Sequence, residues 1–475
     1  MSTARRTFRN ILSLLVSRSL SKVVAFFVSV WLVRYLGTED LGMLETALGF
    51  VALFGYISDF GTQHFVIREV SRERNATAAY LSNFLSLQIV FGIVLFGLIV
   101  LIANVFEYEP LIRQAIYLAG AGLIVFGMSA PFKAIFYAHE AIHLSAFLTV
   151  VYAAAGAMLT AGGILIGCGV RFFAGISMVS GLAIVVASHR ICGKRFVLPR
   201  LGNDVGLWWR MLKMSFPYAL LMGATIIYRK IDVQMLYAMK GKIEVGYYSA
   251  VLRFLNPLIM QGQAIVAAML PVLSRKFAVS KGEFRFAAEK TVKYVAALGI
   301  PMAVGAFLLS DEIILLLYGE AFGRSAAALQ ILSWTLALSF LTVVVTYSLV
   351  AAGRVLMMAA FNALGVLANV LLNLVLIPRY SFLGAATATV ACEGALLVAF
   401  MLYMRRSEVA PFPWQDVGKI VFAALIMGGL VFLIRGASVF IVVPAGAMVY
   451  CGVLFLLRFL AKEEKGLLKR ALGPE

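Results

Sequence analysis

Apolar stretches of about 20 residues recur along the whole chain, and this recurrence constrains the fold more than any other feature. A helix of about 20 residues crosses the roughly 30 Å hydrocarbon core of a bilayer. Fourteen such stretches occur, at residues 10–36, 41–66, 79–104, 111–138, 143–167, 171–189, 213–239, 244–273, 288–309, 325–352, 355–377, 383–404, 418–434 and 438–460. The longest polar connection, 189–213, is too short for a soluble domain. The sequence therefore predicts an all-α polytopic membrane protein with about 14 transmembrane helices.

Composition and motifs narrow the class further. Of the 475 residues, 62% are hydrophobic and only 13% are charged, compared with about 25% charged in a typical soluble domain. The four cysteines stand far apart without metal-site spacing, so neither a zinc site nor a disulfide framework is expected. No nucleotide-binding loop or nucleophile elbow stands out. We therefore expect a transporter without a resident cofactor, and not an enzyme.

Lysine and arginine are distributed unevenly between alternate loops. If the N-terminus lies inside, the cytoplasmic segments hold 27 of the 41 basic residues and the outer loops hold eight. Cytoplasmic loops carry this excess in membrane proteins. We therefore expect a multi-pass protein of the bacterial cytoplasmic (inner) membrane with both termini in the cytoplasm. Membrane topology also explains the net charge of +18, so no nucleic-acid partner is expected.

The chain also contains a weak internal repeat. The segment LGMLETA at 41–47 and the segment VGYYSA at 245–250 place Gly42 and Gly246 204 residues apart, each just after a predicted outer turn. The first and seventh predicted spans begin at residues 10 and 213, which is about the same separation. This predicts two six-helix lobes, 1–205 and 206–408, followed by two additional helices and a cytoplasmic tail at 409–475. Two lobes in the same orientation place a transport site between them.

Polar side chains follow one face of several predicted spans, at helical steps of three and four residues. Such a face needs an environment wetter than lipid, so we expect these helices to line a cavity. The candidates for its polar lining are Tyr56, Tyr218, Asn256, Asn369 and Asn373.

Ten charged residues fall in the predicted membrane interior, away from the ends of the spans, where each costs at least a few kcal/mol unless it has a partner or water. The six cations are Arg18, Lys22, Lys133, Arg229, Lys230 and Arg253, and the four acids are Glu45, Asp59, Asp232 and Glu393. The cationic excess favours an anionic substrate, because Arg and Lys bind phosphate and carboxylate.

Most of these charges are assigned a role, and two assignments have an alternative. Arg18, Lys22, Arg253, Lys133 and Arg229 are the candidate substrate-binding residues. The acids Asp59, Asp232 and Glu393 are candidates for coupling to a proton or sodium gradient. Alternatively, Arg18 and Lys22 lie in an interfacial segment before a shorter first span, or Arg229 and Asp232 neutralise each other.

Several short motifs, taken in order, carry a resemblance to a known family. These are NILS at 10–13, RYLGTEDLG at 34–42, SDFG at 58–61 and VIRE at 66–69, then SFP at 215–217, IDV at 231–233, VGYYSA at 245–250 and LLYG at 316–319. Over about residues 8–405, the chain resembles the bacterial polysaccharide-exporting, Wzx-type flippases of the multidrug/oligosaccharidyl-lipid/polysaccharide exporter superfamily.

The resemblance implies a MATE-like fold and a function. Members of this family have two six-helix lobes and two extra helices, and they move an undecaprenyl-diphosphate-linked oligosaccharide from the inner to the outer leaflet by alternating access around a cationic cavity. Arg18, Lys22 and Arg253 are the positions to which that cationic role is carried over. The partners implied are the lipid-linked oligosaccharide, the lipid bilayer and polysaccharide polymerase or export proteins.

Two alternatives remain from the sequence. The first is a MATE-type drug or metabolite antiporter, which would favour an acidic cavity because its substrates are often cations. The second is an integral-membrane polysaccharide polymerase or transferase, which would usually present a catalytic group on a sizeable outer loop. The outer loops expected here are short.

Overall fold

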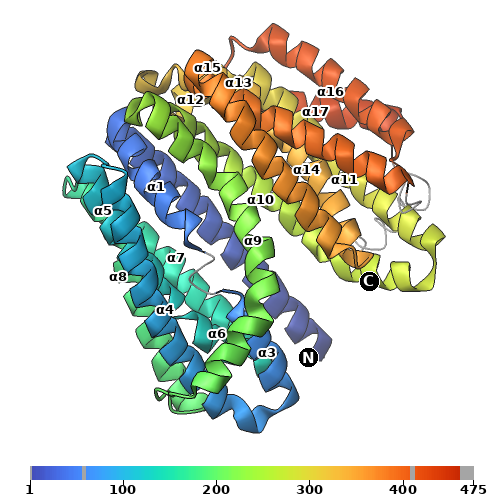
Figure 1. Cartoon of the computed structure of the whole chain (residues 1–475). Coiled ribbons are helices and arrows are strands. Elements are labelled where there is room, and N and C mark those ends of the chain that lie inside the picture. The colour runs from blue at the N-terminus through green and yellow to red at the C-terminus, as the bar shows by residue number, and fades with distance from the viewer. Residues whose placement is uncertain (1–2, 56–59, 407–411, 460–475) are drawn as a thin grey trace. The chain divides into compact units, whose positions relative to one another are not determined.

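The computed structural model describes residues 3–55, 60–406 and 412–459, and it describes side chains over 24–55, 60–216, 230–354, 356–404 and 412–459. All regular secondary structure in these residues is helical (Figure 1). Contacts divide the chain into two compact units, Met1–Ser249 and Ala250–Glu475. The expectation of an all-α polytopic membrane protein is confirmed, and ten described segments are long and apolar enough to cross a membrane.

The first unit holds α1 and α3 to α9 and the beginning of α10. The helices are α1 (Thr3–Leu53), α3 (Thr62–Arg72), α4 (Thr77–Val105), α5 (Pro110–Gly127), α6 (Ala130–Ala138), α7 (Ile142–Leu165), α8 (Val170–Arg195), α9 (Val205–Lys240) and α10 (Lys242–Val279). A 3-10 turn, η1 (Arg74–Ala76), connects α3 to α4. Helix α1 packs against α5, α7, α8 and α9, so it is central to this unit.

The second unit holds the rest of α10 and the remaining helices. These are α11 (Lys281–Leu308), α12 (Ser310–Tyr318), the 3-10 turn η2 (Glu320–Phe322), α13 (Ser325–Leu332), α14 (Trp334–Ala351), α15 (Val355–Arg406), α16 (Trp414–Ile434) and α17 (Val439–Leu456). Helix α14 packs against both α11 and α15, while α16 packs against α11 and α17.

Two long helices extend over more than one predicted span: α15 contains spans 355–377 and 383–404, and α1 contains span 10–36 and the first part of span 41–66. Helix α1 bends at Gly37 (φ 68°, ψ −174°) and α15 bends at Ser381 (φ 55°, ψ −135°). A positive φ with extended ψ is a conformation that glycine adopts almost alone. Gly241 has nearly the same backbone conformation as Gly37, with φ 84° and ψ −178°. Gly37 and Gly241 are 204 residues apart, the same separation as the repeat found in the sequence.

Three predicted spans are interrupted. Residues 41–66 are shared between α1 and α3, with left-handed backbone at Phe60 (φ 51°) and Gly61 (φ 73°). Residues 111–138 divide into α5 and α6 just before Pro131, and residues 325–352 divide into α13 and α14 at Ser333. Proline lacks the N–H that continues a helical hydrogen-bond ladder, which explains the second break.

Side-chain caps fix the start of α9 and of α11. Asp204 accepts a hydrogen bond from the Leu207 amide at 3.0 Å at the start of α9. Ser280 Oγ accepts a hydrogen bond from the Gly282 amide at 3.1 Å at the start of α11. Such caps satisfy amides that have no intrahelical partner.

Candidate functional site

Six of the predicted site residues fall where the structure gives no side-chain description. Tyr56 and Asp59 lie outside the described residues, and Arg18, Lys22, Tyr218 and Arg229 lie outside the described side chains. The other seven can be placed, and they divide between the two units.

Lys133 lies in the short helix α6 of the first unit and is half-buried. Its ammonium lies 4.3 Å from the ring centroid of Phe126, at the end of α5. A cation over an aromatic face is stabilised by about 0.5–2 kcal/mol, more where water is excluded. The aromatic ring therefore explains part of how this charge is tolerated inside a predicted span.

Asp232 in α9 is buried, with 5% of its surface exposed. Its Oδ2 accepts a hydrogen bond from the Tyr248 hydroxyl at 3.1 Å, and Tyr248 is 1% exposed. A buried carboxylate needs such donors because its desolvation is costly. This hydrogen bond joins α9 to the beginning of α10 within the first unit.

The second unit holds the other five placed residues. Arg253 is half-buried in α10. The pKa of Tyr318 is raised because the hydroxyl is buried, and the Arg253 charge offsets part of that increase. Asn256 is exposed, and Glu393 in α15 is half-buried.

Asn369 and Asn373 form a buried amide pair in α15. They are 1% and 0% exposed, and Asn373 Nδ2 donates to Asn369 Oδ1 at 2.9 Å. Asn369 Nδ2 has no hydrogen-bond acceptor within the described part of the chain. The sequence predicts that both amides line a cavity, and in this structure both side chains are buried.

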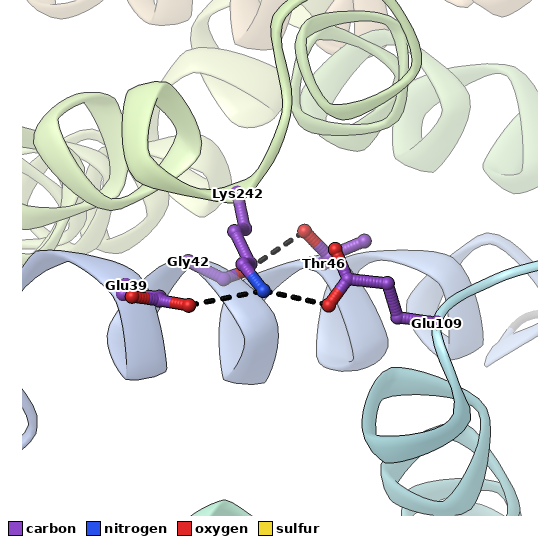
Figure 2. A network of polar contacts seen from close by, with 5 residues as sticks. All are labelled: Glu39, Gly42, Thr46, Glu109 and Lys242. Atoms are coloured by element: carbon purple, nitrogen blue, oxygen red, sulfur yellow. Dashed lines mark hydrogen bonds and ion pairs between the residues drawn. The ribbon is translucent and has the colours of Figure 1, made fainter.

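The most extensive polar network described in the first unit lies where the two repeats meet. We call it the Lys242 junction, defined by Glu39, Gly42, Thr46, Glu109, Lys242 and Gly246. Figure 2 shows Lys242 between two carboxylates: its Nζ lies 3.0 Å from Glu39 Oε1 and 2.6 Å from Glu109 Oε2. The Lys242 side chain is 24% exposed and the two glutamates about half, so solvent weakens both ion pairs.

The backbones of the two repeats meet at the junction through reciprocal glycine contacts. A Cβ on residue 42 would overlap the Lys242 carbonyl oxygen, and a Cβ on residue 246 would overlap the Thr38 carbonyl oxygen. Thr38 and Lys242 are themselves 204 residues apart, so each repeat presents the same carbonyl to the other's glycine. Only glycine permits this approach at either position.

Side-chain hydrogen bonds extend the junction along α1 and α9. The Thr46 hydroxyl donates to the Gly42 carbonyl at 2.7 Å (Figure 2), and Gln234 Nε2 donates to the Thr46 carbonyl at 2.9 Å. The Tyr108 hydroxyl donates to Gln234 Oε1 at 2.9 Å. Burial raises the pKa of Tyr108 to about 12, with the Tyr237 hydroxyl a smaller cause. The network therefore joins α1, α9, α10 and the loop before α5.

The Lys242 junction can hold these segments together but has no catalytic arrangement. Within the described residues, no group of three or more His, Cys, Asp or Glu side chains could hold a metal ion. Sequence reasoning counted Lys242 only as a charge of an outer loop. The recurrence of Gly37 and Gly42 as Gly241 and Gly246 was the signal that could have found the junction.

Comparisons with known proteins agree with this architecture. The family model for polysaccharide biosynthesis proteins matches residues 7–277, and the MatE model matches residues 217–375. A relative from Haloferax volcanii, "probable low-salt glycan biosynthesis flippase Agl15", is 24% identical over 229 residues, 48% of each chain. The match therefore spans about half the length of this relative.

Two solved structures share the fold. The lipid II flippase MurJ in an inward closed conformation has a TM-score of 0.81 at 15% identity, covering 94% of this chain and 99% of that one. An inward-facing multidrug resistance MATE family transporter of the MOP superfamily has a TM-score of 0.67 at 15% identity, covering 83% of this chain and 98% of that one. At these identities the likeness establishes the fold alone.

Proposed function

The chain belongs to the polysaccharide biosynthesis protein family, and from this premise we propose that it is a flippase for lipid-linked oligosaccharides. Its substrate would be an undecaprenyl-diphosphate-linked repeat unit of O-antigen, capsule or exopolysaccharide. The chain would move this unit from the inner to the outer leaflet of the bacterial cytoplasmic membrane, with both termini in the cytoplasm. The similarity to Agl15, a probable glycan biosynthesis flippase, and to MurJ, a lipid II flippase, supports this substrate class.

The observation that supports alternating access best is the Lys242 junction. By the charge distribution of the loops, this junction lies at the outer end of the first unit. Its carbonyl–glycine contacts and ion pairs hold the outer ends of α1, α9 and α10 together. On this proposal, release of a substrate to the outer leaflet would require these contacts to separate.

The predicted polar residues are assigned to parts of the substrate. The diphosphate would bind Arg18, Lys22 and Arg253, with Lys133 and Arg229 adding positive charge. The sugars would meet Tyr56, Tyr218 and Asn256, and they would meet Asn369 and Asn373 in a state in which this buried pair becomes accessible. Asp59, Asp232 and Glu393 would couple transport to a proton or sodium gradient. Polymerase or export proteins would receive the flipped unit.

The alternatives have less support. The MatE model matches only residues 217–375, a shorter part of the chain than residues 7–277, and the cationic excess among intramembrane charges does not favour a cationic drug. A polymerase or transferase needs a catalytic constellation, which the Lys242 junction does not provide.

Complementation of a deletion strain tests the proposal. Deletion of the gene should cause the lipid-linked repeat unit to accumulate in the inner leaflet, and the intact gene should reverse this. Arg18→Ala and Arg253→Ala should each abolish most export at unchanged protein level, because the diphosphate would lose a cationic partner. Arg435→Ala, in the exposed turn after α16, is the matched control. Unchanged export in both variants would refute the binding role of these arginines.

A further inference from the structure

A groove in the second unit combines cations at one end with an apolar interior. It has a volume of about 970 Å³ and is bordered by α11, α14, α15 and the beginning of α16. Helix α14 packs against both α11 and α15, and its Val344 and Val345 line the groove. We call this feature the α14 groove.

The groove is polarised along its length. Lys281 and Arg285 lie in the first two turns of α11, whereas Ala288 and Val292 line the groove one and two turns farther along the same helix. At 1.5 Å per residue, Lys281 and Val292 are about 16 Å apart along the helix. The positive charge is therefore confined to one end, and the other end is apolar.

The two cations keep hydrogen-bonding capacity for a ligand. Arg285 Nε lies 3.3 Å from Glu289 Oε1, which occupies one of the five N–H donors of the guanidinium. The nearby Glu283 carboxylate pairs with Lys276. Within the described residues, no carboxylate pairs with the Lys281 ammonium.

Exposed apolar side chains line the wall that α15 contributes. Val398 is 56% exposed and Leu402 is 57% exposed, and both line the groove. At its charged end, Trp414 is 69% exposed and its ring lies 4.7 Å from that of Phe412. Tryptophan is enriched at the level of lipid headgroups, so this end of the groove fits the headgroup region and the apolar end fits acyl chains.

We propose that the α14 groove binds one anionic phospholipid of the adjoining leaflet, with its phosphate on Lys281 and Arg285 and an acyl chain along the exposed side chains of Val398 and Leu402. Basic pockets between transmembrane helices bind anionic lipid headgroups in this way. The groove lies wholly in the second unit, and neither the substrate-binding residues nor the Lys242 junction lines it. The proposal is therefore independent of the transported substrate.

Native mass spectrometry of the purified, delipidated full chain tests this site. The probes are palmitoyl-oleoyl phosphatidylglycerol, phosphatidylcholine with the same chains, and glycerol 3-phosphate. One phosphatidylglycerol should bind with a measurable preference over phosphatidylcholine. The variant Lys281→Gln/Arg285→Gln should weaken that binding about 30-fold, since each cation near the headgroup contributes about 1 kcal/mol and 1.4 kcal/mol corresponds to tenfold.

Two further variants separate the groove from general charge effects. Val398→Trp should fill the groove from an exposed position and weaken phosphatidylglycerol binding without removing a cation. Lys194→Gln/Arg195→Gln removes an exposed basic pair at the end of α8 and should leave binding unchanged. The melting temperature of each variant shows whether it has folded.

Four outcomes would overturn the proposal. They are unchanged lipid binding in both folded groove variants, equal binding of the two phospholipids, competition by glycerol 3-phosphate at equal concentration, and displacement of phosphatidylglycerol by undecaprenyl diphosphate. The third would identify a free-phosphate site, and the fourth a site for the transported lipid.

Discussion

The reciprocal glycine contacts at the Lys242 junction give the sharpest prediction about the contact between α1 and α10. In Gly42→Ala, the new Cβ would lie 2.6 Å from the Lys242 carbonyl carbon and 3.1 Å from the Gly246 nitrogen. Carbon atoms in contact are separated by about 3.5–4.0 Å, so the two backbones must move apart by about 1 Å. Because the obstacle is backbone, no side-chain rotation relieves the overlap.

The cost of this displacement sets the expected effect. Overpacking of a close-packed contact costs about 1–3 kcal/mol, and 2 kcal/mol changes the ratio of closed to open junction about 30-fold. Gly246→Ala should have a similar effect, since its Cβ would lie 2.8 Å from the Thr38 carbonyl carbon. In Gly42→Ala/Gly246→Ala, the loss of free energy at the contact should be smaller than the sum of the losses in the two single variants. One separation of the backbones relieves both overlaps.

Cysteine accessibility measures the opening. Thr46 is fully buried beside Gly42, so Thr46→Cys in a background with Cys168, Cys192, Cys392 and Cys451 replaced by Ser should react slowly with an impermeant maleimide. Gly42→Ala should accelerate this labelling tenfold or more.

Gly97→Ala is the control for the change in helix propensity, because a Cβ at residue 97 of α4 meets no atom within 4 Å. Labelling rates in Gly42→Ala and Gly246→Ala equal to that in Gly97→Ala would refute the reasoning.

Three further predictions concern single side chains outside that contact. Tyr108→Phe should destabilise the protein by about 1 kcal/mol through loss of the bond to Gln234. Because the folded pKa of Tyr108 is about 12, above the usual 10, the stabilisation present below pH 10 is lost between pH 10 and 12. Burial and the Arg74 charge lower the pKa of His139, whose Nε2 lies 3.0 Å from Thr77 Oγ1. Its neutral form is therefore favoured, and acidification below about pH 6.5 should destabilise the protein. Lys293 is 2% exposed and donates to the Phe459 carbonyl at 2.7 Å, so Lys293→Met should cost about 1–3 kcal/mol and loosen α17.

The melting temperature checks all three predictions, and for Tyr108 and His139 it is measured as a function of pH. The wild-type protein and Tyr108→Phe should converge in melting temperature above pH 12, and a constant difference would contradict the assigned pKa. His139→Gln should remove part of the loss of stability at acid pH, whereas an unchanged pH profile would contradict the role of His139. For Lys293→Met, protease cleavage within α16 or α17 should become faster, and an unchanged melting temperature and cleavage rate would contradict the anchoring role.

The positions of the helices could be predicted from the sequence because the relevant signals are local. Apolar length identifies spans without knowledge of their neighbours, and the described residues of the predicted spans are mostly helical, with breaks in three spans. Gly37 and Gly241 were recognisable as turns for the same reason, since a positive φ is a property of one residue. The bend at Ser381 could not be recognised from the sequence, because serine does not favour a backbone conformation with positive φ.

The packing environment of the polar residues was less accessible to prediction. Asn369 and Asn373 have the spacing of a cavity-lining face, yet both are buried within the second unit. Helical spacing shows that two side chains share a face, but only packing decides what covers that face.

The partners of Lys242 illustrate the same division. The repeat of 204 residues and the apolar spans can be identified from the sequence alone, and they predict the fold class. That Lys242 contacts Glu39 and Glu109, 203 and 133 residues away, follows only when α1, α5 and α10 are packed together. The physical reason is that hydrophobicity and backbone preference act on neighbouring residues, whereas an ion pair or a glycine contact depends on the positions of whole helices.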